Sequence, residues 1–126
     1  MLREMVDNEE DVTKAVTTKV TNMSYLFMRP ITVPVSTFNQ DISGWDVSNV
    51  TNMFEMFLAA SSFNQPLNDW DVSNVTNMYG MFSETTSFNQ DLSNWSVGNV
   101  TECGFFSRNT PQWTLPQPNF TNCNPD

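Results

Sequence analysis

Residues 38–53 read Phe-Asn-Gln-Asp-Ile-Ser-Gly-Trp-Asp-Val-Ser-Asn-Val-Thr-Asn-Met, and this string returns almost unchanged 25 residues later. Between residues 38–62 and 63–87, 15 of 25 aligned positions are identical, and residues 88–112 continue the repeat in a weaker form. Repeats of this length are supersecondary units that bury their apolar faces only by stacking on one another. The sequence therefore predicts a solenoid of stacked coils.

Two periodicities inside each repeat predict an α/β coil. Trp45 and Val47 alternate as in a short strand, whereas Val50, Met53 and Met56 step by three as in a helical turn. Each 25-residue coil should therefore hold a short strand and a short helical turn. The expected strands are 45–48, 70–73 and 95–98, and the expected helical turns are 50–57, 75–82 and 100–106.

Sequence outside the full repeats is expected to cap the two ends of one domain. An apolar stripe within residues 2–16 predicts a helical cap, and extra residues at 29–34 predict a bulged loop. Prolines after residue 113 cannot extend a ladder of hydrogen bonds. The expected units of domain 1–126 are an N-terminal cap (1–19), a degenerate repeat with an insertion (20–37), repeats 38–62, 63–87 and 88–112, and a C-terminal cap (113–126).

The repeated string resembles a known family. The frame Ile42-x-x-Trp45-x-Val47 is similar to that of leucine-rich repeats, and the whole of 38–53 resembles the short repeats of BspA-like leucine-rich-repeat surface proteins and of mycoplasma-type surface lipoproteins. This resemblance covers residues 20–27 and 38–106. It implies a right-handed leucine-rich-repeat-like solenoid, an extracellular or cell-surface location, and adhesion or ligand binding. It transfers no catalytic residue.

Composition excludes several classes of function. The 14 Asp and Glu against five Lys and Arg give a net charge of −9, which argues against nucleic acid and anionic lipid as partners. Histidine is absent, and with it the commonest general base and metal ligand. We therefore expect no enzyme, no metal and no cofactor. No apolar run is long enough to insert in a membrane, and the first residues lack the apolar region of a signal peptide.

Repetition arranges side chains in rows. We interpret Trp45, Trp70 and Trp95 as core residues, with an exposed aromatic platform for carbohydrate as the alternative. Two sets of asparagines recur at the same interval and are expected to bond between coils, although the second set also forms Asn-x-Thr glycosylation sequons. These sets are Asn39, Asn64 and Asn89, and Asn49, Asn74 and Asn99.

The candidate ligand-binding residues alternate with the core set and should point outward. They are Asp46, Ser48, Asp71, Ser73 and Ser96. Two carboxylates in register repel each other unless a cation or a ligand donor lies between them. We therefore predict a polar, faintly acidic strip, with simple solvated turns as the alternative. A calcium site would need more oxygen ligands, and Ser96 interrupts the acidic series.

The two cysteines form a candidate disulfide. Cys103 takes the core position of Met53 and Met78 in the last repeat, and Cys123 lies in the proline-rich tail. A bond between them would hold the tail over the last core layer and fits an exported protein. The alternative is a small buried hydrophobic residue and a free surface thiol.

These observations favour a non-catalytic binding or adhesion module that presents its polar strip to a protein or a glycan. A second hypothesis is a structural spacer within a larger repeat protein. A third is binding to ice or another crystal surface through the row Thr51, Thr76 and Thr101, which generally needs longer regular arrays than three repeats.

Overall fold

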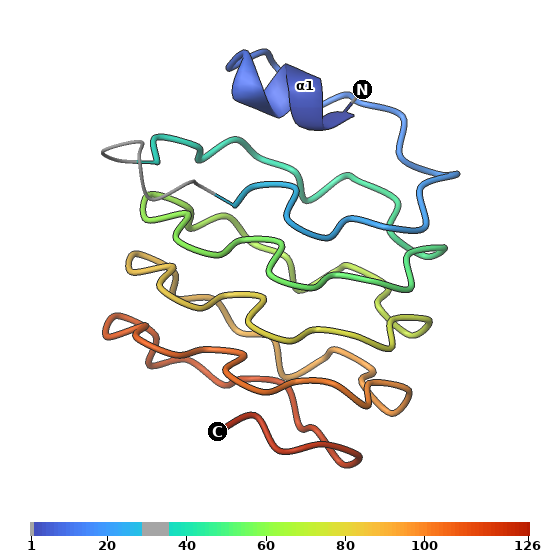
Figure 1. The fold of residues 1–126 in the computed structure, drawn as a ribbon, viewed down its shortest axis with the longest axis vertical. Coiled ribbons are helices and arrows are strands. Elements are labelled where there is room, and N and C mark those ends of the chain that lie inside the picture. The colour runs from blue at the N-terminus through green and yellow to red at the C-terminus, as the bar shows by residue number, and fades with distance from the viewer. Residues whose placement is uncertain (1, 29–35) are drawn as a thin grey trace.

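The computed structural model describes residues 2–28 and 36–126 of the chain. One helix, α1 (Leu2–Asp7), lies across one end of a stack of chain layers (Figure 1). The predicted bulged loop at 29–34 lies outside the described residues. We name the parts of the stack layer 1 (residues 10–28), layer 2 (38–62), layer 3 (63–87), layer 4 (88–112) and the tail (113–126).

The expected α/β leucine-rich-repeat-like solenoid is wrong. Within the described residues α1 is the only helix, and no strand is present. The predicted strands and helical turns are irregular segments and turns. Pairing of β type is confined, in the same part of the chain, to isolated parallel bridges between Asn22 and Asn52, Asn52 and Asn77, and Asn77 and Glu102.

Alternating backbone hydrogen bonds explain why the layers are neither helical nor sheet-like. The N–H groups of Met53, Glu55, Phe57 and Ala59 donate to carbonyls of layer 3. The amides between them instead close turns within layer 2, as the Met56 N–H does on the Met53 carbonyl at 3.3 Å. An α-helix requires every N–H to reach the carbonyl four residues back, and that does not happen here.

Left-handed residues prevent these turns from continuing as a helix. One such residue recurs in every layer: Tyr25, Glu55, Gly80 and Phe105 have φ of 60°, 48°, 60° and 54°. A second recurs four residues later, at Ala59, Glu84 and Asn109. Because L-residues form right-handed helices, a left-handed residue reverses the path. The spacing by three that resembles a helix comes from consecutive tight turns.

Layer 1 begins earlier than the sequence pattern indicates. Residues 11–23 lie in register with 41–53, at an interval of 30 instead of 25. Trp45 Nε1 donates to the Val12 carbonyl at 2.9 Å, and Thr17 Oγ1 donates to the Asp46 carbonyl at 2.9 Å. Val12 is therefore core, whereas Val16 points outward and is 89% exposed. The two do not share a helical stripe.

The core is a set of side-chain ladders that run through the stack. Phe57 lies 5.1 Å from both Phe27 and Phe82, ring centroid to centroid, with nearly parallel planes. Trp70 and Trp95 are stacked at 6.5 Å, and each indole N–H donates to a carbonyl of the preceding layer. Both are 4% exposed, which confirms the interpretation of the tryptophans as core residues.

Candidate functional site

The predicted strip is present on the surface as two closed turns. Asp46 Oδ1 accepts hydrogen bonds from the Ser48 hydroxyl at 2.6 Å and from the Ser48 N–H at 3.0 Å. Asp71 Oδ1 accepts the same two bonds from Ser73, at 2.6 and 3.1 Å. Ser96 is exposed at the equivalent position of layer 4. The structure therefore brings each aspartate to its own serine, and each carboxylate keeps its second oxygen outside this turn.

Electrostatics of the strip follow from these turns. The serine hydroxyl and then the serine N–H lower the pKa of Asp46 and Asp71 below the ordinary value. The charge of Asp46 opposes this for Asp71, because equivalent residues of adjacent layers face one another. Asp41 and Asp91 form the same turn with Ser43 and Ser93, elsewhere in their layers. The motif thus serves as a general turn device of the repeat.

Asparagine amides connect the layers, as predicted. Asn74 Nδ2 donates to the Ser48 carbonyl at 2.7 Å, and Asn99 Nδ2 donates to the Ser73 carbonyl at 2.8 Å. In the other set, Asn64 N–H donates to Asn39 Oδ1 at 2.9 Å. These bonds hold the strip in register, because they join the corner of one layer to the corner before it. The sequon amides therefore have a structural role in the repeat.

The threonine row next to this corner also bonds back into the stack. Thr76 Oγ1 donates to the Thr51 carbonyl at 3.2 Å, and Thr101 Oγ1 donates to the Thr76 carbonyl at 3.5 Å. The hydroxyl protons are thus directed along the stack. A crystal-surface binder would instead need them directed outward.

An exterior aromatic row was missed by sequence reasoning. Tyr25, Phe54, Tyr79 and Phe105 lie in successive layers with ring centroids 5.2, 5.4 and 5.6 Å apart. Tyr25 is 44% exposed and Phe105 is 41% exposed. Arg108 lies 5.1 Å from the Phe105 ring centroid. The recurrence of an aromatic residue at 54 and 79 was the available signal, but the expected helical turn placed no special surface there.

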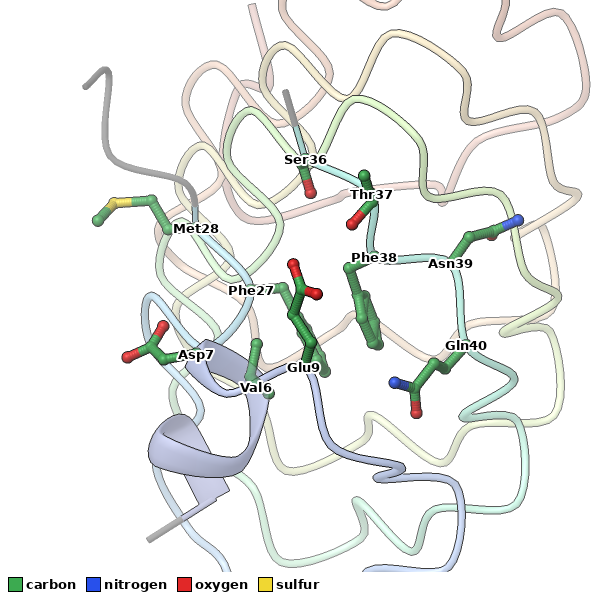
Figure 2. Close-up of a pocket in the computed structure, with 10 residues that line it drawn as sticks. All are labelled: Val6, Asp7, Glu9, Phe27, Met28, Ser36, Thr37, Phe38, Asn39 and Gln40. Atoms are coloured by element: carbon green, nitrogen blue, oxygen red, sulfur yellow. The ribbon is translucent and has the colours of Figure 1, made fainter. Parts of the chain in front are cut away.

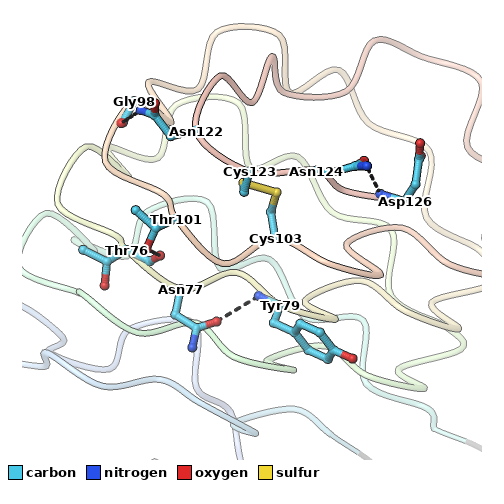
Figure 3. Close-up of a disulfide and its surroundings, with 10 residues drawn as sticks. All are labelled: Thr76, Asn77, Tyr79, Gly98, Thr101, Cys103, Asn122, Cys123, Asn124 and Asp126. Atoms are coloured by element: carbon cyan, nitrogen blue, oxygen red, sulfur yellow. Dashed lines mark hydrogen bonds between the residues drawn. A yellow bond between two sulfur atoms is a disulfide. The ribbon is translucent and has the colours of Figure 1, made fainter.

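Cys103 and Cys123 are joined at the other end of the stack (Figure 3). Their sulfurs are at the bonded distance of 2.04 Å, and Cys103 is 1% exposed. The tail also packs Phe120 edge-on against Phe106, and Asn122 Nδ2 donates to the Gly98 carbonyl at 2.6 Å. The tail therefore covers the core side of layer 4.

A pocket of about 220 Å³ lies where α1 meets the start of layer 2 (Figure 2). The rings of Phe27 and Phe38, stacked at 4.2 Å, form its apolar part. Glu9 and Ser36 contribute polar atoms, and the buried Ser36 hydroxyl has no hydrogen-bond partner among the described residues. The pocket is small and mixed in character, and its geometry defines no reaction.

Metal-binding clusters and membrane-spanning helices were considered for the residues that the structure describes. No group of three or more histidine, cysteine, aspartate or glutamate side chains is placed there to hold a metal ion. No helix in this part of the chain has the length and apolarity needed to cross a membrane.

Comparison with protein families identifies the class of repeat. Residues 1–114 match the family described as "Mycoplasma protein of unknown function, DUF285", and the chain belongs to this family. Comparison with the curated proteins gave no match, and comparison with the solved structures gave none. The family match supports the mycoplasma-type part of the resemblance and the tandem repeat, and it does not extend to the BspA-like proteins.

Proposed function

We propose that the protein is a non-catalytic binding module of a surface-type repeat protein, and that it binds a protein or a glycan through its exterior side-chain rows. The exterior aromatic row carries the proposal. Its rings contact one another from layer to layer, and the two end rings are more than two-fifths exposed. Aromatic side chains supply large contact areas with little loss of conformational entropy, and they are enriched at interfaces.

The acidic strip is the second candidate face. Asp46 and Asp71 retain an oxygen outside their turns, and Ser96 gives the strip a neutral end. Each carboxylate nevertheless already accepts two hydrogen bonds from its own serine. We therefore rank the strip below the aromatic row as a source of affinity.

A cell-surface or extracellular location belongs to the same proposal. Support comes from the family match to a mycoplasma repeat family and from the disulfide, because such bonds persist in oxidising compartments. The net charge of −9 favours a well-hydrated surface and disfavours binding to anionic lipid or nucleic acid.

Binding to arrays of glycans and of extracellular proteins tests the proposal. Phe54→Ser with Tyr79→Ser should abolish binding, whereas the matched pair Asp46→Ala with Asp71→Ala should retain it. Loss in the aspartate variant alone would assign binding to the strip. Unchanged binding in both variants would contradict both faces.

The alternative is a structural spacer within a larger repeat protein. One observation favours it: the aspartate–serine and asparagine bonds satisfy the exterior polar groups within the stack itself. A wild-type protein that binds nothing on either array, while remaining folded, would support the spacer and reject the binding module.

A further inference from the structure

A row of backbone N–H groups crosses every layer at equivalent positions. In layer 2 the donors are Met53, Glu55, Phe57 and Ala59, and each reaches a carbonyl of layer 3 at 2.8 to 2.9 Å. In layer 3 the equivalent donors reach layer 4 at 2.7 to 2.9 Å. Those pairs are Met78 to Glu102, Gly80 to Gly104, Phe82 to Phe106 and Glu84 to Arg108.

The same row in layer 4 is open. The N–H groups of Cys103, Phe105, Ser107 and Asn109 have no acceptor among the described residues. The amides between them close turns as in the other layers, Phe106 on the Cys103 carbonyl and Arg108 on the Phe105 carbonyl. The alternation is thus intact, and the four free donors lie on the side where the next layer would pack.

The tail contacts this row at Cys103 and at Ser107, whose hydroxyl donates to Gln117 Oε1 at 2.9 Å, but no tail carbonyl accepts from the four N–H groups in the described part of the chain. It is tied to Cys103 at one end of the row, and Asp126 N–H donates to Asn124 Oδ1 at 3.0 Å in the same turn that Asn77 forms with Tyr79 (Figure 3). Beyond that point lies a pocket of about 320 Å³, lined by Phe105, Ser107, Arg108, Pro125 and Asp126.

We propose that this open edge binds an extended segment of another polypeptide, which adds to the stack as a further layer. The acceptors in the inner layers are carbonyls at every second residue, from Asn77 through Ser83. Carbonyls at that interval are a property of polypeptide backbone, and edge addition of an extended peptide is a known mode of recognition. This surface shares Phe105 with the exterior aromatic row of the proposed function and is otherwise made of backbone donors.

Side chains at the edge define the partner further. Phe105 ends the exterior aromatic row, and at each inner boundary a ring of one layer contacts a ring of the next. The bound segment should therefore carry an aromatic side chain that packs on Phe105. The Phe105 ring is 41% exposed and thus accessible to it.

A second copy of the chain does not fit this edge through its own layer 1. The matching carbonyl row at that end is partly occupied, because Arg3 Nη1 donates to the Leu26 carbonyl at 3.0 Å and also to the Tyr25 carbonyl. Arg3 is held in turn by Asp7 at 2.9 Å, and α1 lies across that end of the stack (Figure 1). Head-to-tail stacking of copies would have to displace the helix.

A synthetic peptide of residues 76–84 is the sharpest probe, because this segment accepts the equivalent bonds from layer 2 and carries Tyr79. Titrated into the isotope-labelled full chain, it should shift the amide signals of Phe105, Ser107 and Asn109 and slow their hydrogen exchange. Ser107→Pro removes one donor and should weaken binding about fivefold or more, the factor for one hydrogen bond of about 1 kcal/mol. Ser107→Ala is the matched control and should bind as the wild type does.

Several outcomes would overturn the proposal. They are no shift with the peptide, shifts confined to other layers, or equal affinity for Ser107→Pro in a folded protein. If Ser107→Pro does not fold, the test is hydrogen exchange of the three amides in the wild type. Slower exchange with the peptide supports the proposal, and unchanged exchange contradicts it. Concentration-dependent self-association of the wild type through these amides would also contradict the proposal, because the partner at the edge would then be a second copy of the chain. Phe54→Ser with Tyr79→Ser should still bind the peptide, so that failure here is separable from failure of the proposed function.

Discussion

The boundary between layers 2 and 3 and the boundary between layer 4 and the tail are built differently. At the inner boundary, repetition supplies a row of four backbone bonds, parallel rings and an indole bond to a carbonyl. At the outer boundary the rings of Phe106 and Phe120 meet edge-on, and a disulfide joins the two sides. Identical neighbours make a layer self-complementary, whereas an end needs a separate device.

Removal of an inner indole should have the largest effect. Trp70→Ala should lower the free energy of unfolding by about 3–5 kcal/mol, because it empties a buried site and leaves the Ile42 carbonyl with the Trp45 N–H but without the indole donor. Trp113→Ala, in the tail, should cost less, because its ring is 8% exposed and packs against Phe88 and Phe106 of layer 4, with no equivalent tryptophan beyond it in the described part of the chain. Denaturant titration measures both.

Val16→Ala is the control for these variants, since Val16 is 89% exposed and should change stability by less than about 0.5 kcal/mol. A loss for Trp70→Ala no larger than this control would contradict the ladder as the main source of stability.

Loss of the disulfide should have the next largest effect and should be local. Replacing both Cys103 and Cys123 by Ala should cost about 3 kcal/mol, because the bond closes a loop with a sequence separation of 20. Hydrogen exchange should accelerate in the tail and in layer 4 while layers 2 and 3 remain protected. Intact mass after alkylation checks the bond first: two reactive thiols in an oxidised preparation would contradict it.

The aspartate turns should give a smaller, pH-dependent effect within the stack. The pKa of Asp46 and of Asp71 is lowered in the folded state, first by the serine hydroxyl and then by the serine N–H. A lowered folded pKa stabilises the protein above the unfolded value, near 3.9, and this contribution is lost as the pH falls through the folded value. The expected result is an acid limb in the stability profile below about pH 4.

Asp46→Asn with Asp71→Asn should flatten part of that limb. Asp69→Asn is the matched control, because Asp69 accepts from its neighbour Asn68 and closes no serine turn within the described residues. Layer 4 has Ser96 and Gly98 at the strip position, so the difference between the profiles reports on the inner layers. Identical profiles for all three proteins would show that these turns are formed equally in the unfolded chain.

The sequence predicted which side chains stack on one another better than it predicted the backbone conformation. The interval of 25 correctly placed Trp45, Trp70 and Trp95 in one buried ladder, because identical residues in a repeat occupy identical sites. It did not reveal the left-handed residues, since Tyr25 and Glu55 are residue types that rarely adopt that conformation. Only Gly80 and Asn109 are residue types that favour this conformation, and two such residues were too weak a signal against the spacing by three, which predicted a helix.

The candidate site was predicted in position but not in detail. Asp46 and Asp71 do lie outward, as alternation with Trp and Val requires. Their closure by Ser48 and Ser73 was foreseeable from the Asp-x-Ser spacing, which is typical of such turns. The open edge of layer 4 could not be predicted, because the sequence does not show which backbone N–H groups of a layer donate to the next layer and which close turns.

The smallest expected effect tests the left-handed position that sequence reasoning missed. Glu55→Gly relieves a φ of 48° and should stabilise the protein by up to about 1 kcal/mol, less the extra entropy of glycine in the unfolded chain. The reverse change in the next layer, Gly80→Ala, should destabilise it, because the new Cβ would lie 3.0 Å from Glu55 Cγ at a φ of 60°. Both N–H groups donate to the next layer, at 2.8 and 2.9 Å, so each change leaves those bonds in place and isolates the backbone strain. Equal stability of wild type and both variants, measured by denaturant titration, would mean that the layer relaxes around this residue and that its recurrence carries no energetic cost.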